Sequence, residues 1–371
     1  PTPHGCAPRP YAEDTGLAMA RHVVPAMRSD SPYMPLPAYP ENLMAPRIAP
    51  LALVPALLLT GCAASAAAPE DSTPTPTETA GFPLTLVNCG FEVTIDAAPE
   101  RVVTIKSTST EMMLALGLGD RIVGTAFPDG PVPEQWADDA AGIPVLAPKL
   151  PNEETVLAAA PDLVYAGWES AFSADAAGDR AELASLGVAS YVQPAACQSA
   201  DQPESLDFEE VFREIQEAGA LFGVPDRAAE LVAEQRAQLD AVEPAEGTPT
   251  ALWWSSGTDT PYVGAGKGAP QLLLETAGFA NIAADVDATW APLGWEAIIA
   301  ADPDVIVLVD SDWNSAEKKK AYLAGNPATA AMTDVREQRY LVIPFAASEA
   351  GVRSVEAAAS LARQYAELDA R

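Results

Sequence analysis

A twelve-residue phrase that occurs twice constrains the architecture of this 371-residue chain more than any other feature. ETVLAAAPDLVY at 154–165 and EAIIAADPDVIV at 296–307 share Glu, Ala, Ala, Pro and Asp at the same five positions. In each copy, proline ends a short helix and the apolar run after Pro-Asp enters a buried strand. Internal repetition at this scale predicts two similar half-domains.

Strands and helices alternate on both sides of one long helical stretch, which predicts an α/β fold. Residues 206–242 have helical periodicity, and Pro225 allows a kink there. We therefore expect a first lobe at 81–205, a linking helix at 206–246 and a second lobe at 247–371. The first lobe is predicted to contain a hairpin at 82–95, strands at 101–105, 121–126, 162–167 and 189–194, and helices at 108–117, 153–160 and 180–186. The second is predicted to contain strands at 250–254, 304–310 and 340–344, and helices at 269–278, 294–301 and 354–369.

Residues 44–62, MAPRIAPLALVPALLLTGC, have the pattern of a bacterial lipoprotein signal peptide. Arg47 supplies a positive start, and the apolar stretch at 48–60 is shorter than the roughly 20 residues that span a bilayer. Thr60 and Gly61 precede Cys62 as in a lipobox, so we expect Cys62 to be lipidated. The alternative is a buried helix with an incidental cysteine.

The segments around this signal lack a core-forming pattern. Residues 63–80 are rich in Pro, Thr, Ala and acidic residues, which predicts a flexible tether. Residues 1–43 are Pro-rich and show no periodicity, so we expect a disordered leader or a misassigned gene start. Cys89 and Cys197 then remain for the folded part, and we expect them to pair, since extracytoplasmic compartments permit disulfides. The alternative is two free buried thiols.

Charge and histidine content exclude several classes of function. A formal net charge of −31 argues against nucleic-acid binding, which needs basic patches. Both histidines lie within the first 22 residues, which excludes a His-built metal site and a Ser-His-Asp triad in the remainder. With no phosphate-cradling P-loop pattern either, we expect no enzymatic activity and no cofactor.

The chain resembles the substrate-binding proteins of ABC importers for iron-siderophores, haem and cobalamin. RVVTI…TEMMLALGLGDRIVGTA followed by EETVLAAAPDLVYAG resembles their first lobe, and PYVGAGKGAPQLLLETAGFANIA followed by GWEAIIAADPDVIVLV resembles their second. The resemblance covers about residues 82–368. It implies two Rossmann-like lobes, each a mostly parallel sheet with flanking helices, joined by one long stiff helix. Substrate would lie in the cleft between the lobes.

Four shorter stretches are most similar to an actinobacterial subgroup of that family. They are TIKSTSTE, WWSSGTDTPYVGAG and the cysteine motifs NCG and AAC. The subgroup is proposed to take up a precursor of the deazaflavin redox coenzyme, so the resemblance favours that ligand, with an iron-siderophore next.

The first letters of the repeated phrase, Glu154 and Glu296, match the permease-docking glutamates of the resembled family. There, one glutamate at the outer tip of each lobe docks into arginine pockets of the permease, as exposed carboxylates can do through bidentate bonds. The alternative is simple stabilisation of a helix N-terminus, worth about 0.3–1 kcal/mol.

Ligand is expected at the carboxyl ends of the parallel strands, where loops face the crevice. Aromatic residues in these loops suit a flat or ringed ligand, and Lys106, Lys267 and Arg353 could hold an anionic group. The alternatives are ordinary packing for each ring and a solvated surface position for each basic residue. Neighbours on a strand face opposite ways, so we expect one of Trp253 and Trp254 to point into the core. The nominated ligand-binding residues are Lys106, Ser107, Thr108, Phe127, Trp168, Glu169, Trp253, Trp254, Ser255, Ser256, Tyr262, Lys267, Trp313, Phe345 and Arg353.

The sequence therefore predicts a lipid-anchored, monomeric solute-binding protein on the extracytoplasmic face of the membrane. We expect it to capture a ringed, anionic organic ligand or metal chelate and to deliver it to an ABC permease dimer with its ATPase. The alternative is a surface signalling or adhesion lipoprotein on the same fold.

Overall fold

The computed structural model describes residues 81–198 and 205–370. The chain enters through the predicted hairpin, in which β1 (Leu84–Asn88) pairs antiparallel with β2 (Phe91–Ile95). Cys89 at its turn is disulfide-bonded to Cys197, with the two Cα atoms 5.2 Å apart. The expected pairing is confirmed.

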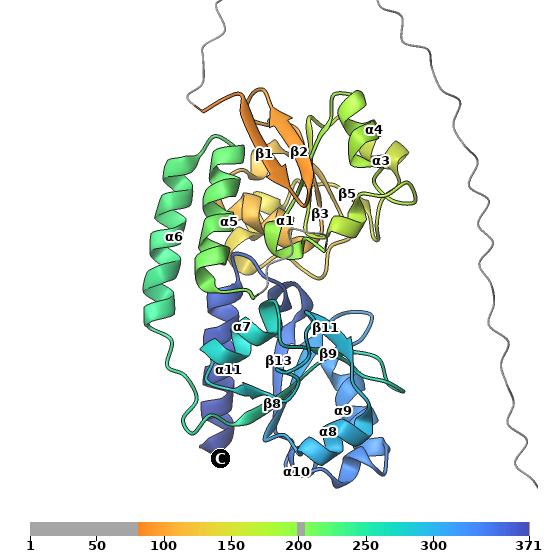
Figure 1. Cartoon of the computed structure of the whole chain (residues 1–371), viewed down its shortest axis with the longest axis vertical. Helices are drawn as coiled ribbons and strands as arrows, with labels where there is room; N and C mark the ends of the chain where they lie inside the picture. The colour runs from red at the N-terminus through yellow and green to blue at the C-terminus, as the bar shows by residue number, and fades with distance from the viewer. Residues whose placement is uncertain (1–80, 199–204, 371) are drawn as a thin grey trace, which may run out of the picture. The chain divides into compact units, whose positions relative to one another are not determined.

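The first lobe contains a five-stranded parallel sheet with strand order β5-β4-β3-β6-β7. Both faces are buried, with Tyr165 and Tyr191 in one core and Val103 and Val164 in the other. This is the environment that near-continuous apolar runs predict for parallel strands. The strands are β3 (Val102–Ile105), β4 (Ile122–Ala126), β5 (Val145–Ala147), β6 (Leu163–Ala166) and β7 (Ala189–Val192), and the helices are α1 (Ser107–Ala115), α2 (Ala137–Ala140), α3 (Glu153–Ala158) and α4 (Arg180–Ser185) (Figure 1).

The second lobe contains a six-stranded mixed sheet with the order β11-β9-β8-β12-β13, and β10 pairs with β8. Strands β8, β12 and β13 run parallel, as expected. The sequence patterns did not predict the short parallel strand β10 or the antiparallel edge that β9 and β11 form. The strands are β8 (Thr250–Ser256), β9 (Tyr262–Gly264), β10 (Ala280–Asn281), β11 (Trp290–Pro292), β12 (Val305–Asp310) and β13 (Tyr340–Pro344). The helices are α7 (Ala269–Thr276), α8 (Trp295–Ala301), α9 (Ala316–Gly325), α10 (Thr333–Arg336) and α11 (Ser354–Asp369).

The prediction of one continuous helix across 206–242 is wrong in its length. Two helices, α5 (Phe208–Leu221) and α6 (Pro225–Asp240), lie side by side (Figure 1). Gly223 between them has φ +70°, and Pro225 lacks the N–H that a continuing helix would need. Arg236 near the end of α6 forms two bonds of 2.5 and 2.6 Å to Glu209 at the start of α5, so the helices are antiparallel. Of these two helices, α6 is therefore the one that carries the chain from the first lobe to the second.

The repeated phrase occupies the same place in both sheets. Its strands, β6 and β12, are the fourth in each strand order. The Asp162 carboxylate accepts the backbone N–H groups of Glu100 at 2.8 Å and Arg101 at 3.1 Å, just before the neighbouring strand β3. Asp304 accepts the N–H of Thr250, the first residue of neighbouring β8, at 2.7 Å. The repeated Asp therefore ties each strand to its neighbour.

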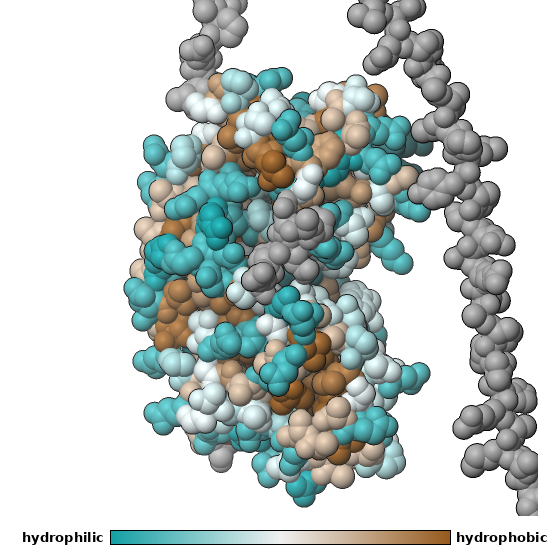
Figure 2. Space-filling model, viewed as in Figure 1, coloured by the Kyte–Doolittle hydropathy of each residue, from teal (hydrophilic) through white to brown (hydrophobic). Residues whose placement is uncertain are grey.

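The surface carries apolar side chains in several separate patches on the face that Figure 2 shows. Exposed large hydrophobic residues come from unconnected elements, such as Val87 in β1, Val145 in β5 and Leu186 after α4. Within residues 81–198 and 205–370, no helix combines the length and apolar character needed to cross a bilayer.

Candidate ligand-binding site

A cavity of about 390 Å³ lies between the two lobes, at the carboxyl ends of the parallel strands. The first lobe contributes Thr108 at the start of α1, Gly167 and Trp168 after β6, and Gln193 after β7. The second lobe contributes residues from β9, from the loop before β11, from the start of α7 and from the turn after β13. The location agrees with the general rule for ligand sites in open α/β sheets.

Three aromatic side chains line the cavity. Trp168 comes from the first lobe, while Tyr262 and Trp290 come from the antiparallel edge of the second. The Tyr262 and Trp290 rings are stacked with an interplanar angle of 15° and a centroid distance of 6.4 Å. Tyr262 remains 44% exposed, so its ring is accessible to a ligand. Such a wall suits a flat or ringed compound.

Two buried residues of the cavity lining, Thr108 and Gln193, each have a polar atom without a hydrogen-bond partner among the described residues. The atoms are Oγ1 of Thr108, a residue 4% exposed, and Nε2 of Gln193, a residue 2% exposed. A Cβ atom at Gly167 would lie 2.3 Å from this oxygen, so only glycine leaves the hydroxyl its space. A buried hydroxyl without a partner is costly, and a bound ligand can provide one.

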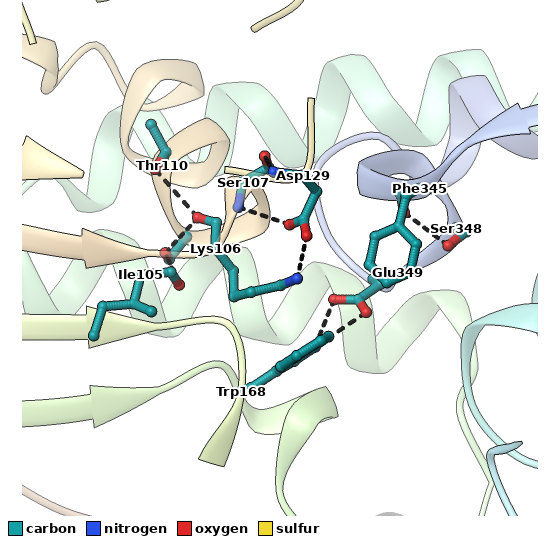
Figure 3. Close-up of polar contacts among 10 residues, drawn as sticks. Ile105, Lys106, Ser107, Thr110, Asp129, Trp168, Phe345, Ser348 and Glu349 are labelled. Atoms are coloured by element: carbon teal, nitrogen blue, oxygen red, sulfur yellow. Dashed lines mark hydrogen bonds and ion pairs between the residues drawn. The ribbon is translucent and has the colours of Figure 1, made fainter. Parts of the chain in front are cut away.

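Lys106 lies in an aromatic cage, of which Figure 3 shows Trp168 and Phe345. It is not among the residues that line the cavity. Its Nζ atom is 3.6 Å from the ring centre of Trp168, 4.3 Å from that of Phe127 and 4.8 Å from that of Phe345. The ammonium also forms an ion pair with Asp129, and both side chains are buried. Asp129 in turn accepts the N–H of Ser107 at 3.1 Å, which holds the start of α1.

Glu349 connects the second lobe to this cage. Both of its carboxylate oxygens accept hydrogen bonds from the indole Nε1 of Trp168, at 3.0 and 2.9 Å (Figure 3). Burial raises the pKa of Glu349 to about 7, while Lys106 and the indole hydrogen bond oppose that shift. Glu349 also lines the cavity.

The three basic residues that were expected to hold an anionic ligand group form ion pairs with carboxylates of the protein itself. Lys106 pairs with Asp129, Lys267 pairs with Asp287 at 2.5 Å, and Arg353 lies 3.5 Å from Glu111 of α1. These cations do not line the cavity. The structure therefore gives no support to the expectation of an anion-binding group.

The expectation that Trp253 or Trp254 faces the cleft is contradicted. Both side chains are fully buried, and they lie in different cores on opposite faces of the second sheet. The alternation along β8 was predicted correctly, but helices cover both faces of the strand. Trp253 packs with residues of α7 and α11, and Trp254 packs with residues of α8 and α9.

Of the nominated residues, Thr108, Trp168 and Tyr262 line the cavity. The Ser107 hydroxyl accepts the backbone N–H of Asp129 at 2.9 Å, and Glu169 accepts the N–H of Gln198 at 2.5 Å. The Trp313 ring packs edge-on against Phe345, and the residue is 58% exposed. The nominated residues that do not line the cavity are Lys106, Ser107, Phe127, Glu169, Trp253, Trp254, Ser255, Ser256, Lys267, Trp313, Phe345 and Arg353.

Several lining residues were missed. Gln193 and Glu349 follow β7 and β13, so the strand-end rule could have identified them. Trp290 begins β11 of the unpredicted antiparallel edge, Asp287 and Thr289 lie in the loop before it, and no pattern in the sequence placed them near the cleft.

Glu154 and Glu296, the first residues of the two copies of the repeated phrase, occupy comparable positions in the two lobes. Each is exposed in the first turn of its helix, α3 and α8 respectively. Cys62 lies outside the described residues. Within those residues, no group of three or more His, Cys, Asp or Glu side chains is placed to hold a metal ion.

The fold and site together define a two-lobed solute-binding protein. Residues 102–347 match the model of the periplasmic binding protein family, and the chain belongs to that family. An uncharacterised ABC transporter substrate-binding lipoprotein, YvrC of Bacillus subtilis, is 26% identical over 275 residues, or 72% of this chain and 82% of the relative. A vitamin B12-binding protein of Photorhabdus laumondii is 22% identical, covering 62% of this chain and 77% of the relative.

A solved structure extends the comparison. The crystal structure described as an ABC-type Fe3+-hydroxamate transport system, from Saccharomonospora viridis, is 31% identical to this chain. It superposes with a TM-score of 0.65 and covers 76% of this chain and 99% of its own.

Proposed function

We propose that this protein is the solute-binding component of an ABC importer and captures a ringed organic ligand or metal chelate between its lobes. The observation that carries the proposal is the cavity itself, to which both lobes contribute and which three aromatic side chains line. Because residues of both lobes would contact one ligand, binding would stabilise the closed arrangement that a permease recognises.

Two ligand classes lead the candidates. The deazaflavin coenzyme precursor is favoured by the subgroup resemblance of the sequence. A ferric hydroxamate chelate is suggested by the 31% identical structure from Saccharomonospora viridis, which is described as an Fe3+-hydroxamate transport system. The cavity of about 390 Å³ is near the lower end of the ~300–1,000 Å³ typical of small-molecule sites. That size favours a compact ring system over a corrinoid.

Membrane attachment and permease docking complete the proposal. Lipidation at Cys62 would tether the protein, and the YvrC relative is named a lipoprotein. Glu154 and Glu296 would dock the two lobes on the permease, since both carboxylates are exposed in comparable positions.

Tryptophan fluorescence of the full-length protein tests the ligand classes. The deazaflavin precursor, a ferric trihydroxamate, haem and cobalamin would each be titrated into the protein. We expect saturable quenching by the deazaflavin precursor, because Trp168 and Trp290 line the cavity. Tight hydroxamate binding without a deazaflavin response would reverse the order of the two candidates. No response to any of the four would refute the proposed ligand class.

A further inference from the structure

We infer that the cavity selects ligands bearing a positively charged group and that Glu349 receives this group. The inference rests on the proposed function, because it names the charge class of the ligand at the same site. It reverses the expectation from the sequence, which favoured an anionic ligand.

The charge of the cavity wall is the first observation. Among the described residues that line the cavity, the charged ones are Asp287 and Glu349, and both are acidic. Asp287 already has Lys267 at 2.5 Å, outside the cavity wall. Glu349 is the carboxylate that a ligand would meet inside.

The surroundings of Glu349 leave its charge incompletely balanced. The titratable groups that act on it are Lys106 and Asp129, and Trp168 adds its indole hydrogen bond. Lys106 is in direct contact with Asp129, so one ammonium serves two carboxylates. The cluster of Lys106, Asp129 and Glu349 therefore has a net charge of −1 when all three are ionised. Burial raises the pKa of Glu349 to about 7, and the nearby Asp129 carboxylate adds to that rise, while Lys106 opposes it.

The remaining wall also suits a cation. Trp168, Tyr262 and Trp290 present aromatic rings, whose faces attract positive charge. The unpaired Oγ1 of Thr108, buried at the cavity, is a further acceptor for a donor group. An anionic ligand would instead meet two carboxylates and, of the described lining, no cation and one unpaired donor, the Nε2 of Gln193.

A charge series on constant scaffolds tests the inference. A ferric trihydroxamate and a tricyclic deazaflavin would each be prepared with a terminal ammonium, acetamide or carboxylate, and their affinities measured with the full chain at pH 8. On the scaffold that binds, the ammonium form should bind about tenfold tighter than the acetamide, as expected for one charge-assisted hydrogen bond, and the carboxylate form should bind weakest. Equal affinities of the three forms would overturn the inference while leaving the proposed function intact. No binding of any of the six compounds would overturn both.

Two variants test whether Glu349 causes the preference for the ammonium form of the ligand. Glu349→Gln keeps the shape and an acceptor for Trp168, and it should reduce the ammonium-to-acetamide ratio to within about threefold. Glu111→Gln is the matched control, because Glu111 is also buried with a pKa of about 7 but does not line the cavity. The control should keep the wild-type ratio. A ratio unchanged in Glu349→Gln, or lost equally in both variants, would overturn the role of Glu349.

Discussion

The indole Nε1 of Trp168 donates to both carboxylate oxygens of Glu349, at 3.0 and 2.9 Å, and so joins the first lobe to the second. Trp168 also covers the ammonium of Lys106 at 3.6 Å. One side chain therefore lines the cavity, shields a buried ion pair and closes the contact between the lobes.

Trp168→Phe keeps a ring over Lys106 but removes the indole donor. We expect the free energy of unfolding to fall by about 1–3 kcal/mol, because a buried carboxylate loses its hydrogen bonds. Urea unfolding measures the change. Trp313→Phe, at an exposed position, is the control and should have little effect. An equal loss in both variants would argue against the indole–carboxylate bond as the cause.

The stability of the folded protein should fall as pH rises from about 5 to 8. Desolvation raises the pKa of Glu214 on α5 to about 8 and that of Glu111 to about 7. The folded state therefore keeps protons that the unfolded chain releases above its ordinary pKa of 4.5, so ionisation at higher pH destabilises it.

Urea unfolding at pH 5.5 and pH 8 checks this direction. We expect a loss of about 1–3 kcal/mol at the higher pH, and a smaller loss in Glu214→Gln. Glu317→Gln, at an exposed site, should keep the wild-type pH dependence. Greater stability at pH 8 than at pH 5.5 would contradict the buried neutral carboxyl groups.

The repeated aspartates should matter for stability and not for ligand recognition. Asp162→Ala leaves the N–H groups of Glu100 and Arg101, just before β3, without their acceptor. Asp304→Ala does the same to the N–H and the hydroxyl of Thr250. We expect each to cost about 1–3 kcal/mol in urea unfolding. Asp285→Ala is the control, because Asp285 is exposed in the loop between β10 and β11. Full stability in both aspartate variants would show that water replaces the carboxylate without cost.

The two exposed glutamates should matter for transport and not for binding. In the double variant Glu154→Ala, Glu296→Ala, ligand affinity should remain that of the wild type while uptake by cells falls severalfold. Glu317→Ala removes another exposed glutamate from the first turn of a helix and should leave uptake unchanged. Normal uptake in the double variant would remove the docking role.

Patterns that depend on local sequence predicted most of the architecture. The phrase with Glu154 and its copy with Glu296 predicted two related half-domains, and their strands occupy the same sheet position. The helix across 206–242 was overestimated because apolar periodicity continues through Gly223 and Pro225. Whether the chain bends or folds back there depends on packing, such as the close approach of Gly219 to Ala228.

The site was harder to predict because it depends on pairings between distant residues. The rule that ligands bind at strand ends located the cavity and identified Thr108 and Trp168. The sequence could not show that Lys106 would form an ion pair with Asp129, or that Arg353 would form one with Glu111. Those two pairings changed the expected charge of the ligand.

The affinity of Trp290→Ala for the best-binding compound of the fluorescence screen tests the central claim most directly, because Trp290 lines the cavity from the second lobe. Equilibrium dialysis would compare the affinity of Trp290→Ala with that of the wild type and that of Trp136→Ala. Trp136 lies on a separate groove lined by residues of α6 and α11. If both lobes hold the ligand in this cavity, Trp290→Ala should weaken binding by about tenfold or more and Trp136→Ala should not. Wild-type affinity in Trp290→Ala would contradict the account.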